Sequence, residues 1–129
     1  MKIKKYKSNC KLIYEGEYKE GKRNGKGKEY NDDGELIFEG EYKEGERWNG
    51  KGKEYNEYGK LIFEGEYLNG ERWNGKGKEY DYDSKLRFEG EYLNGQKNGK
   101  GKEYEYGELI FEGEYLNGNK WNGSGYENI

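Results

Sequence analysis

Few side chains in this sequence are of the types that carry out catalysis. The 129-residue chain has no histidine, so the commonest general base of enzymes is missing. Its serines, Ser8, Ser84 and Ser124, have no basic partner nearby in the sequence, and Cys10 belongs to no catalytic motif. The many glutamates recur at fixed intervals beside lysines, which is typical of a solvated strand face. We therefore predict that the chain is not an enzyme.

The segment Asp81-Tyr82-Asp83 is the best candidate for a metal site. A calcium loop places oxygen ligands at spaced positions and closes with a bidentate glutamate. The residues that follow Asp83 supply neither feature, and the segment is more typical of a turn. We expect no metal ion and no cofactor.

Lysines recur in pairs separated by one residue, and such a row could bind anionic lipid headgroups at roughly 1 kcal/mol per lysine. The pairs are Lys26 and Lys28, Lys51 and Lys53, Lys76 and Lys78, and Lys100 and Lys102. A glutamate is expected opposite each lysine, and the net charge of the chain is −3. We therefore keep phospholipid binding, through Lys51, Lys53, Lys76 and Lys78, as the alternative function. Nucleic acid is not expected, because its binding proteins carry a basic excess.

A sequence repeat positions these residues. The pentad aromatic-Glu-Gly-Glu-Tyr occurs five times, at intervals of 24, 25, 25 and 23 residues. Its first residues are Tyr14, Phe38, Phe63, Phe88 and Phe111. A fixed period in this range indicates a repeat protein, in which each unit buries its apolar face only by stacking on its neighbours. Such proteins usually bind partners or act as scaffolds.

Each repeat predicts a β-hairpin. In the third repeat, residues 61–67 alternate with the period of two that is typical of a half-buried strand. Residues 68–74 are rich in asparagine and glycine and predict a loop, and residues 75–80 alternate again. The expected fold is all-β: an elongated single-layer antiparallel β-hairpin meander of about eleven strands. At about 4.8 Å per strand, the stack would be roughly 50 Å long.

Charge pairing sets the expected register of the hairpin. The pairs expected in the third repeat are Tyr67–Gly75, Gly65–Gly77, Phe63–Glu79, Glu66–Lys76 and Glu64–Lys78. This register places opposite charges face to face, which stabilises a strand pair by about 0.2–1 kcal/mol for each pair of residues. It also places glycines under the aromatic rings, an arrangement that offsets the cost of glycine in strands.

The segments Phe63-Glu-Gly-Glu-Tyr67, Asn69-Gly70 and Gly75-Lys-Gly77 together resemble the MORN repeat, and the match recurs along essentially the whole chain. The resemblance implies a twisted sheet of hairpins with an aromatic-lined groove, in a scaffold, a partner-binding module or a lipid-associated module. Two departures stand out. The second aromatic residue is tyrosine where the family often has tryptophan, and asparagine replaces the histidine that often precedes Gly-x-Gly.

The repeats predict one domain with an N-terminal capping half-repeat. The expected segments are 1–13 for the half-repeat, 14–37, 38–62, 63–87 and 88–110 for the full repeats, and 111–129 for the C-terminal repeat. No apolar run approaches the roughly 18–20 residues that span a bilayer, and Met1-Lys-Ile-Lys-Lys5 lacks the apolar region of a signal peptide. We expect a cytoplasmic protein or one held at a membrane surface.

The aromatic face of the sheet is the predicted working surface, because no amphipathic helix in the sequence would cover it. Exposed aromatic stripes tend to mark contact sites. A helix or peptide of a partner protein, or a second copy of the chain, could occupy the aromatic–glycine groove. The alternative is that the rings only pack on one another. The candidate partner-binding residues are Tyr42, Trp48, Phe63, Tyr67, Trp73, Phe88, Tyr92, Phe111, Tyr115 and Trp121.

Overall fold

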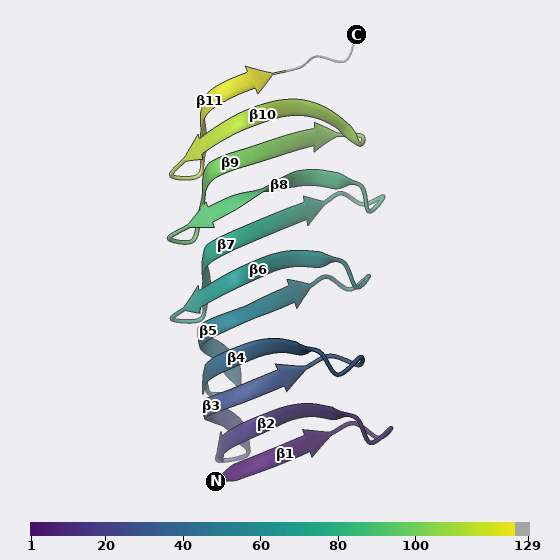
Figure 1. Ribbon diagram of the computed structural model, residues 1–129, viewed down its shortest axis with the longest axis vertical. Coiled ribbons are helices and arrows are strands. Elements are labelled where there is room, and N and C mark those ends of the chain that lie inside the picture. The colour runs from purple at the N-terminus through teal and green to yellow at the C-terminus, as the bar shows by residue number, and fades with distance from the viewer. Residues whose placement is uncertain (126–129) are drawn as a thin grey trace. The chain divides into compact units, whose positions relative to one another are not determined.

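The computed structural model describes residues 1–125, and every regular element in that range is a β-strand. The strands are β1 (Lys2–Tyr6), β2 (Leu12–Lys19), β3 (Lys22–Tyr30), β4 (Leu36–Lys43), β5 (Glu46–Tyr55), β6 (Leu61–Leu68), β7 (Glu71–Tyr80), β8 (Leu86–Leu93), β9 (Gln96–Glu105), β10 (Glu108–Leu116) and β11 (Asn119–Gly125). Successive strands are neighbours in one open sheet (Figure 1). The predicted single-layer antiparallel meander of eleven strands is confirmed. None of the described residues forms a helix that could cross a membrane.

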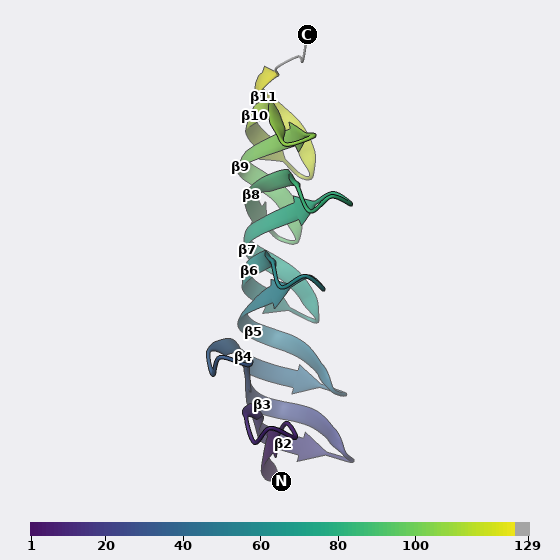
Figure 2. The same cartoon turned by 90° about the vertical axis from the view of Figure 1, so that its right-hand side faces the viewer.

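The sheet divides into two compact units, which we describe separately. Unit 1 comprises Met1–Lys53 and Glu66–Glu71, and unit 2 comprises Glu54–Gly65 and the chain from Arg72 onward. The strands within the hairpins are curved rather than flat (Figure 2). The half-repeat predicted at residues 1–13 contains β1, which pairs with β2. The last strand, β11, ends at Gly125, so residues 126–129 of the predicted C-terminal repeat lie outside the described residues.

Each hairpin closes with a two-residue turn in which both residues have positive φ. The φ angles are 51° and 89° at Glu44 and Gly45, and 52° and 85° at Asn69 and Gly70. This is the type I′ turn, whose twist matches that of the strands and which favours Asn-Gly. The loop predicted at residues 68–74 is therefore wrong in length, because only Asn69 and Gly70 separate β6 from β7.

The second repeat contains a tryptophan, Trp48, that the first and fourth repeats lack. This extra residue lies in β5 rather than in a loop. In the β4–β5 pair, Tyr42 is opposite Arg47 and Glu41 is opposite Asn49. Trp48, between Arg47 and Asn49, is therefore the unpaired residue of a β-bulge. The β2–β3 hairpin lacks this tryptophan and also closes with a two-residue turn, but its register shifts by two residues, because Gly16 is opposite Gly27 and Tyr18 is opposite Arg23.

The register that charge pairing predicted is not found in the third hairpin, which contains Trp73. A Cβ atom on Gly65 would lie 2.6 Å from the Cα of Gly75, so Gly65 faces Gly75 and the predicted Gly65–Gly77 and Tyr67–Gly75 pairs are wrong. The predicted offset occurs within the hairpins that lack this tryptophan, where Gly16 is opposite Gly27 and Gly90 is opposite Gly101. It also occurs between consecutive repeats. In the β7–β8 pair, Gly77 is opposite Gly90, and both lysines of β7 are opposite glutamates of β8.

Side chains hold the turns between repeats. The Oδ1 atom of Asn56 accepts hydrogen bonds from the N–H groups of Tyr58 and Lys60, at 2.9 and 3.0 Å. Asp81 binds the N–H groups of Asp83 and Lys85 in the same way, each at 2.9 Å. The Asp81-Tyr82-Asp83 segment is a turn, as the sequence predicted, and its first carboxylate is engaged within that turn.

Candidate functional site

The aromatic rings form an interior rather than an exposed groove. The exposed fractions are 4% for Tyr42, 0% for Phe63, 6% for Tyr67, 2% for Phe88, 8% for Phe111 and 4% for Tyr115, and Tyr92 is half-buried. The expectation that this face is exposed is therefore wrong. The rings pack on one another edge to face, with centroids 5.6 Å apart for Phe38 and Tyr67 and 5.4 Å apart for Phe88 and Tyr115.

The glycines of the pentad and of Gly-x-Gly allow this close packing. A Cβ atom on Gly27 would lie 2.6 Å from Cε1 of Tyr14, and one on Gly77 would lie 2.4 Å from Cε1 of Tyr92. Real Cβ contacts are never this short, so the rings occupy the space that a side chain at these positions would need. The prediction that the rings lie over glycines is confirmed.

A basic side chain lies over the first aromatic ring of each pentad. The guanidinium carbon of Arg47 lies 4.8 Å from the centroid of Phe38, within the range of a cation–π interaction. The other distances are 4.5 Å for Arg23 over Tyr14, 5.2 Å for Arg72 over Phe63, 3.8 Å for Lys97 over Phe88 and 4.8 Å for Lys120 over Phe111. Our sequence reasoning missed these residues. A signal was present, because a basic residue follows the second aromatic by five positions in all five repeats.

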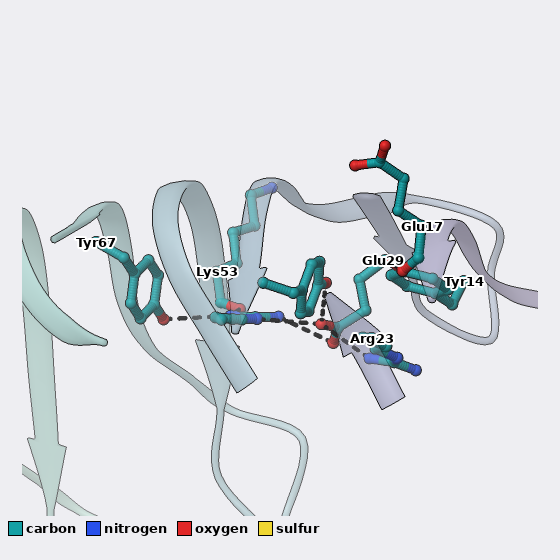
Figure 3. A network of polar contacts seen from close by, with 8 residues as sticks. Tyr14, Glu17, Arg23, Glu29, Lys53 and Tyr67 are labelled. Carbon is teal, nitrogen blue, oxygen red and sulfur yellow. Dashed lines mark hydrogen bonds and ion pairs between the residues drawn. The ribbon is translucent and has the colours of Figure 1, made fainter. Parts of the chain in front are cut away.

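A carboxylate joins these cations in unit 1. Glu29 accepts hydrogen bonds from Nε and Nη2 of Arg47, at 3.2 and 3.1 Å, and from the hydroxyl of Tyr42, at 2.7 Å. Nη1 of Arg23 lies 3.4 Å from the same carboxylate. The remaining guanidinium nitrogen of Arg47, Nη1, donates to the hydroxyl of Tyr67 at 3.2 Å. Figure 3 shows this chain of contacts running from Arg23 through Glu29 to Tyr67.

The network shifts the pKa values of its members in opposite directions. Burial raises the pKa of the Glu29 carboxyl, but the hydrogen bonds from Arg47 and Tyr42 and the nearby guanidinium charges outweigh burial and hold that pKa below its usual value. Burial and the hydrogen bond to Glu29 hold the pKa of Tyr42 far above its usual value. Glu29 is therefore charged and Tyr42 is neutral at neutral pH.

The same arrangement recurs in unit 2. Lys97 lies 3.3 Å from Glu79, and Lys120 lies 3.3 Å from Glu103. The hydroxyl of Tyr115 donates to Glu103, and Arg72 binds Glu54. Each of these carboxylates stands two residues after the second glycine of Gly-x-Gly, on the same face as the rings. This face is thus filled by contacts within the protein.

The opposite face carries rows of alternating charge, and we call it the glutamate–lysine face. In unit 1, one row runs across five neighbouring strands through Lys4, Glu15, Lys28, Glu39 and Lys51. In unit 2, a row runs through Lys78, Glu89, Lys102 and Glu112. The predicted pairing of lysines with glutamates across neighbouring strands is confirmed. Within the second hairpin the individual partners differ from those expected, because Glu39 is opposite Lys51.

This face is hollowed in each unit. The hollow of unit 1 has a volume of about 1030 Å³ and is lined by charged residues and glycines, with Ile3 as its one large apolar residue. The hollow of unit 2 has a volume of about 380 Å³ and lies among Ile62, Lys78, Glu89 and Lys102. Glycines from neighbouring strands line both hollows.

The remaining predicted site residues are the tryptophans of the partner-binding site and the lysines of the lipid alternative, and they differ in exposure and contacts. Trp48 is half-buried, and Cζ3 of its ring lies 3.1 Å from the point that a Cβ atom on Gly70 would occupy. The Trp73 carbonyl accepts a hydrogen bond from the N–H of Gly95 at 2.8 Å, whereas Trp121 is 67% exposed. Lys51, Lys76 and Lys78 each lie opposite a glutamate, and the main-chain carbonyl of Lys53 accepts a hydrogen bond from Arg47.

The asparagines that precede Gly-x-Gly in the second and third repeats have a structural role. The Oδ1 atoms of Asn49 and Asn74 accept hydrogen bonds from the N–H groups of Asn69 and Asn94, at 2.9 and 3.0 Å. These donors are the first residues of the next type I′ turns, so each asparagine binds the turn of the following hairpin. This contact accounts for asparagine at the position where the family often has histidine.

The fold and the recurring group of ring, cation and carboxylate define a β-hairpin repeat protein. The family model of the MORN repeat matches residues 14–35 and 88–104, and the other copies of the pentad form the same hairpin. These two matches are consistent with a MORN-repeat protein. MORN repeats are non-catalytic modules that are often involved in binding. No curated protein matches the chain at a significant level.

Proposed function

We propose that the chain is a non-catalytic scaffold that binds a helical segment of another protein on the glutamate–lysine face. The observation that carries this proposal is the contrast between the two faces. The rings of one face are covered by cations and neighbouring rings, whereas the glutamate–lysine face is hollowed in each unit. A partner can reach the second face without displacing any part of the protein.

The charge pattern defines the chemistry of the partner. Because lysines and glutamates alternate along each row, a ligand that lies along the row meets both signs in turn. The ion pairs within the rows are weak, as the Lys28–Glu39 pair shows, with a separation of 3.9 Å and side chains that are 45% and 58% exposed. Such pairs can exchange for pairs with a partner, and complementary charge then sets the partner's register.

A helix suits the spacing of these rows. Neighbouring strands are about 4.8 Å apart, so the charge changes sign at that interval. One turn of an α-helix advances about 5.4 Å. A helix that carries alternating charges at intervals of three or four residues would therefore place one charge beside each successive strand.

Other ligands fit this face less well. Small-molecule sites are lined mainly by apolar and aromatic side chains, whereas the hollow of unit 1 is lined mainly by charged residues and glycine. Anionic lipids and nucleic acids select an excess of positive charge, and here glutamates balance the lysines. A homodimer through the aromatic face would have to use rings that are already covered.

Neutralising two neighbouring charge pairs on this face of unit 1 should remove partner binding. In the row variant, Lys28 and Glu39 of the row and the adjacent pair, Lys26 and Glu41, are all replaced by glutamine, which leaves the net charge unchanged. In the matched turn variant, Lys19, Glu20, Lys22 and Glu46 are replaced instead; all four are exposed residues at the ends of hairpins. Binding of the partner's minimal segment, made as a peptide, is then measured by calorimetry.

We expect the wild type and the turn variant to bind alike and the row variant to bind at least about tenfold more weakly, a difference of about 1.4 kcal/mol. The peptide should become helical on binding. Equal binding by the row variant would contradict the proposal. Salt-sensitive flotation with anionic vesicles, lost when Lys51, Lys53, Lys76 and Lys78 are replaced, would support the lipid alternative instead.

A further inference from the structure

Three exposed tyrosines stand at successive turns between repeats in unit 2. Tyr58, between β5 and β6, is 70% exposed, Tyr82, between β7 and β8, is 106% exposed, and Tyr106, between β9 and β10, is 76% exposed. We call these three residues the tyrosine rim. Large rings this exposed are costly in water unless they have a use, and contiguous ones tend to mark contact sites.

The backbone holds the rim in place. The Asn56 and Asp81 side chains bind the turns that carry Tyr58 and Tyr82. Tyr106 forms a two-residue turn with Gly107, with φ angles of 52° and 82°. The rings are therefore presented from ordered turns, which lowers the entropic cost of binding a ligand.

The spacing of the rim points to one kind of ligand. The turns that carry the three tyrosines differ in length, but consecutive ones are two strands apart, which is about 9.6 Å at the usual strand spacing. A polyproline II helix has three residues per turn and rises about 3.1 Å per residue, so it repeats every 9.3 Å or so. A proline-rich segment can thus place one proline against each ring, and tyrosine-lined surfaces are a common way to recognise such segments.

Acidic residues outnumber basic ones around the rim. Glu57 precedes Tyr58, Asp81 and Asp83 flank Tyr82, and Glu105 precedes Tyr106, whereas the same turns contain two lysines, Lys60 and Lys85. Basic residues beside the prolines would be attracted to these carboxylates. The chain itself contains no proline, so the ligand is not a segment of this chain.

We propose that the tyrosine rim binds a proline-rich segment in the polyproline II conformation, with basic residues at its end. This site is separate from the hollows of the glutamate–lysine face, and it does not depend on the function proposed for that face. Unit 1 offers an internal contrast, because its turn between β3 and β4, Asn31 to Gly34, carries two aspartates and no aromatic residue.

The test uses a fluorescent peptide of nine prolines followed by two arginines, titrated with the full chain and with two triple variants. The rim variant is Tyr58→Ser, Tyr82→Ser and Tyr106→Ser. The control variant is Leu93→Ser, Leu116→Ser and Trp121→Ser, which removes apolar side chains that are 47%, 43% and 67% exposed. A second peptide replaces the prolines with alternating glycine and serine and keeps both arginines. Thermal melts check that both variants remain folded.

We expect saturable binding of the proline peptide to the wild type and the control variant, and binding at least about tenfold weaker to the rim variant. The glycine–serine peptide should not bind. Amide chemical-shift changes should be confined to residues 56–60, 81–85 and 105–108. The proposal is overturned if the wild type shows no saturable binding, if the rim variant binds equally well, or if the glycine–serine peptide binds with the same affinity.

Discussion

Replacing Gly40 by alanine is expected to lower the free energy of unfolding by about 3 kcal/mol. A Cβ atom at this position would lie 2.1 Å from the carbonyl oxygen of Asn49 and 2.6 Å from the Cα of Gly50. Both are backbone atoms of the neighbouring strand, at the bulge that Trp48 creates, so no side chain can move aside to relieve the clash. Equilibrium unfolding in urea measures the effect.

Gly59→Asn is the matched control for this substitution. Gly59 has a φ of 79°, and a Cβ atom there would meet nothing within 4 Å. Asparagine tolerates this left-handed conformation, so the control should unfold at nearly the wild-type urea concentration. If Gly40→Ala proves as stable as the wild type, the close approach of β4 and β5 is wrong.

Replacing Glu29 by alanine should destabilise the protein by about 2 kcal/mol, because hydrogen bonds to charged groups contribute about 1.5–3 kcal/mol each when partly buried. Glu29 is 20% exposed in the ion pair with Arg47, and it also accepts from the hydroxyl of Tyr42. Its loss removes the acceptor of the buried Tyr42 hydroxyl and of the Nε and Nη2 atoms of Arg47. Chemical unfolding at neutral pH measures the change.

The contribution of Glu29 to the free energy of unfolding should decrease as the pH falls. The pKa of Glu29 is lower in the folded state than in the unfolded state. Its stabilisation is therefore fully present above the usual carboxyl pKa, and it is lost as the pH falls through the folded-state value. The stability curves of the wild type and Glu29→Ala should converge in acid.

An exposed ion pair provides the control for this effect. Lys7 and Asp32 are 2.7 Å apart, with side chains that are 44% and 65% exposed. Asp32→Ala should leave the stability unchanged, because such pairs contribute little. A difference between wild type and Glu29→Ala that stays constant down to pH 2 would contradict the role assigned to this carboxylate.

The sequence predicted the hairpins well because their signals are local. The pentad alternates with the period of a strand, and pairs such as Asn69-Gly70 are the preferred residues of type I′ turns. The position of the inserted tryptophan was harder to predict. One extra residue can lengthen a turn or form a bulge within a strand, and the composition of the segment fits both. The register of β4 and β5 depends on which of these occurs.

The burial of the rings could not be read from one repeat. Alternation placed Phe63 and Tyr67 on one face, but it did not show what covers them. The cover comes from cations such as Arg47 and Arg72, and charged residues near turns are normally assigned to solvent. Their guanidinium groups instead lie over rings and bind carboxylates of the same unit, and these contacts appear only in three dimensions.

NMR with a water-soluble paramagnetic agent tests most directly whether the aromatic face is interior. The four phenylalanines, Phe38, Phe63, Phe88 and Phe111, all lie on this face and are at most 8% exposed, whereas Tyr82 is 106% exposed. In a sample with labelled Phe and Tyr rings, the agent should broaden the Tyr82 signals and leave all four Phe rings sharp. Phe signals broadened as strongly as those of Tyr82 would contradict the burial of these rings and restore the aromatic face as an open surface.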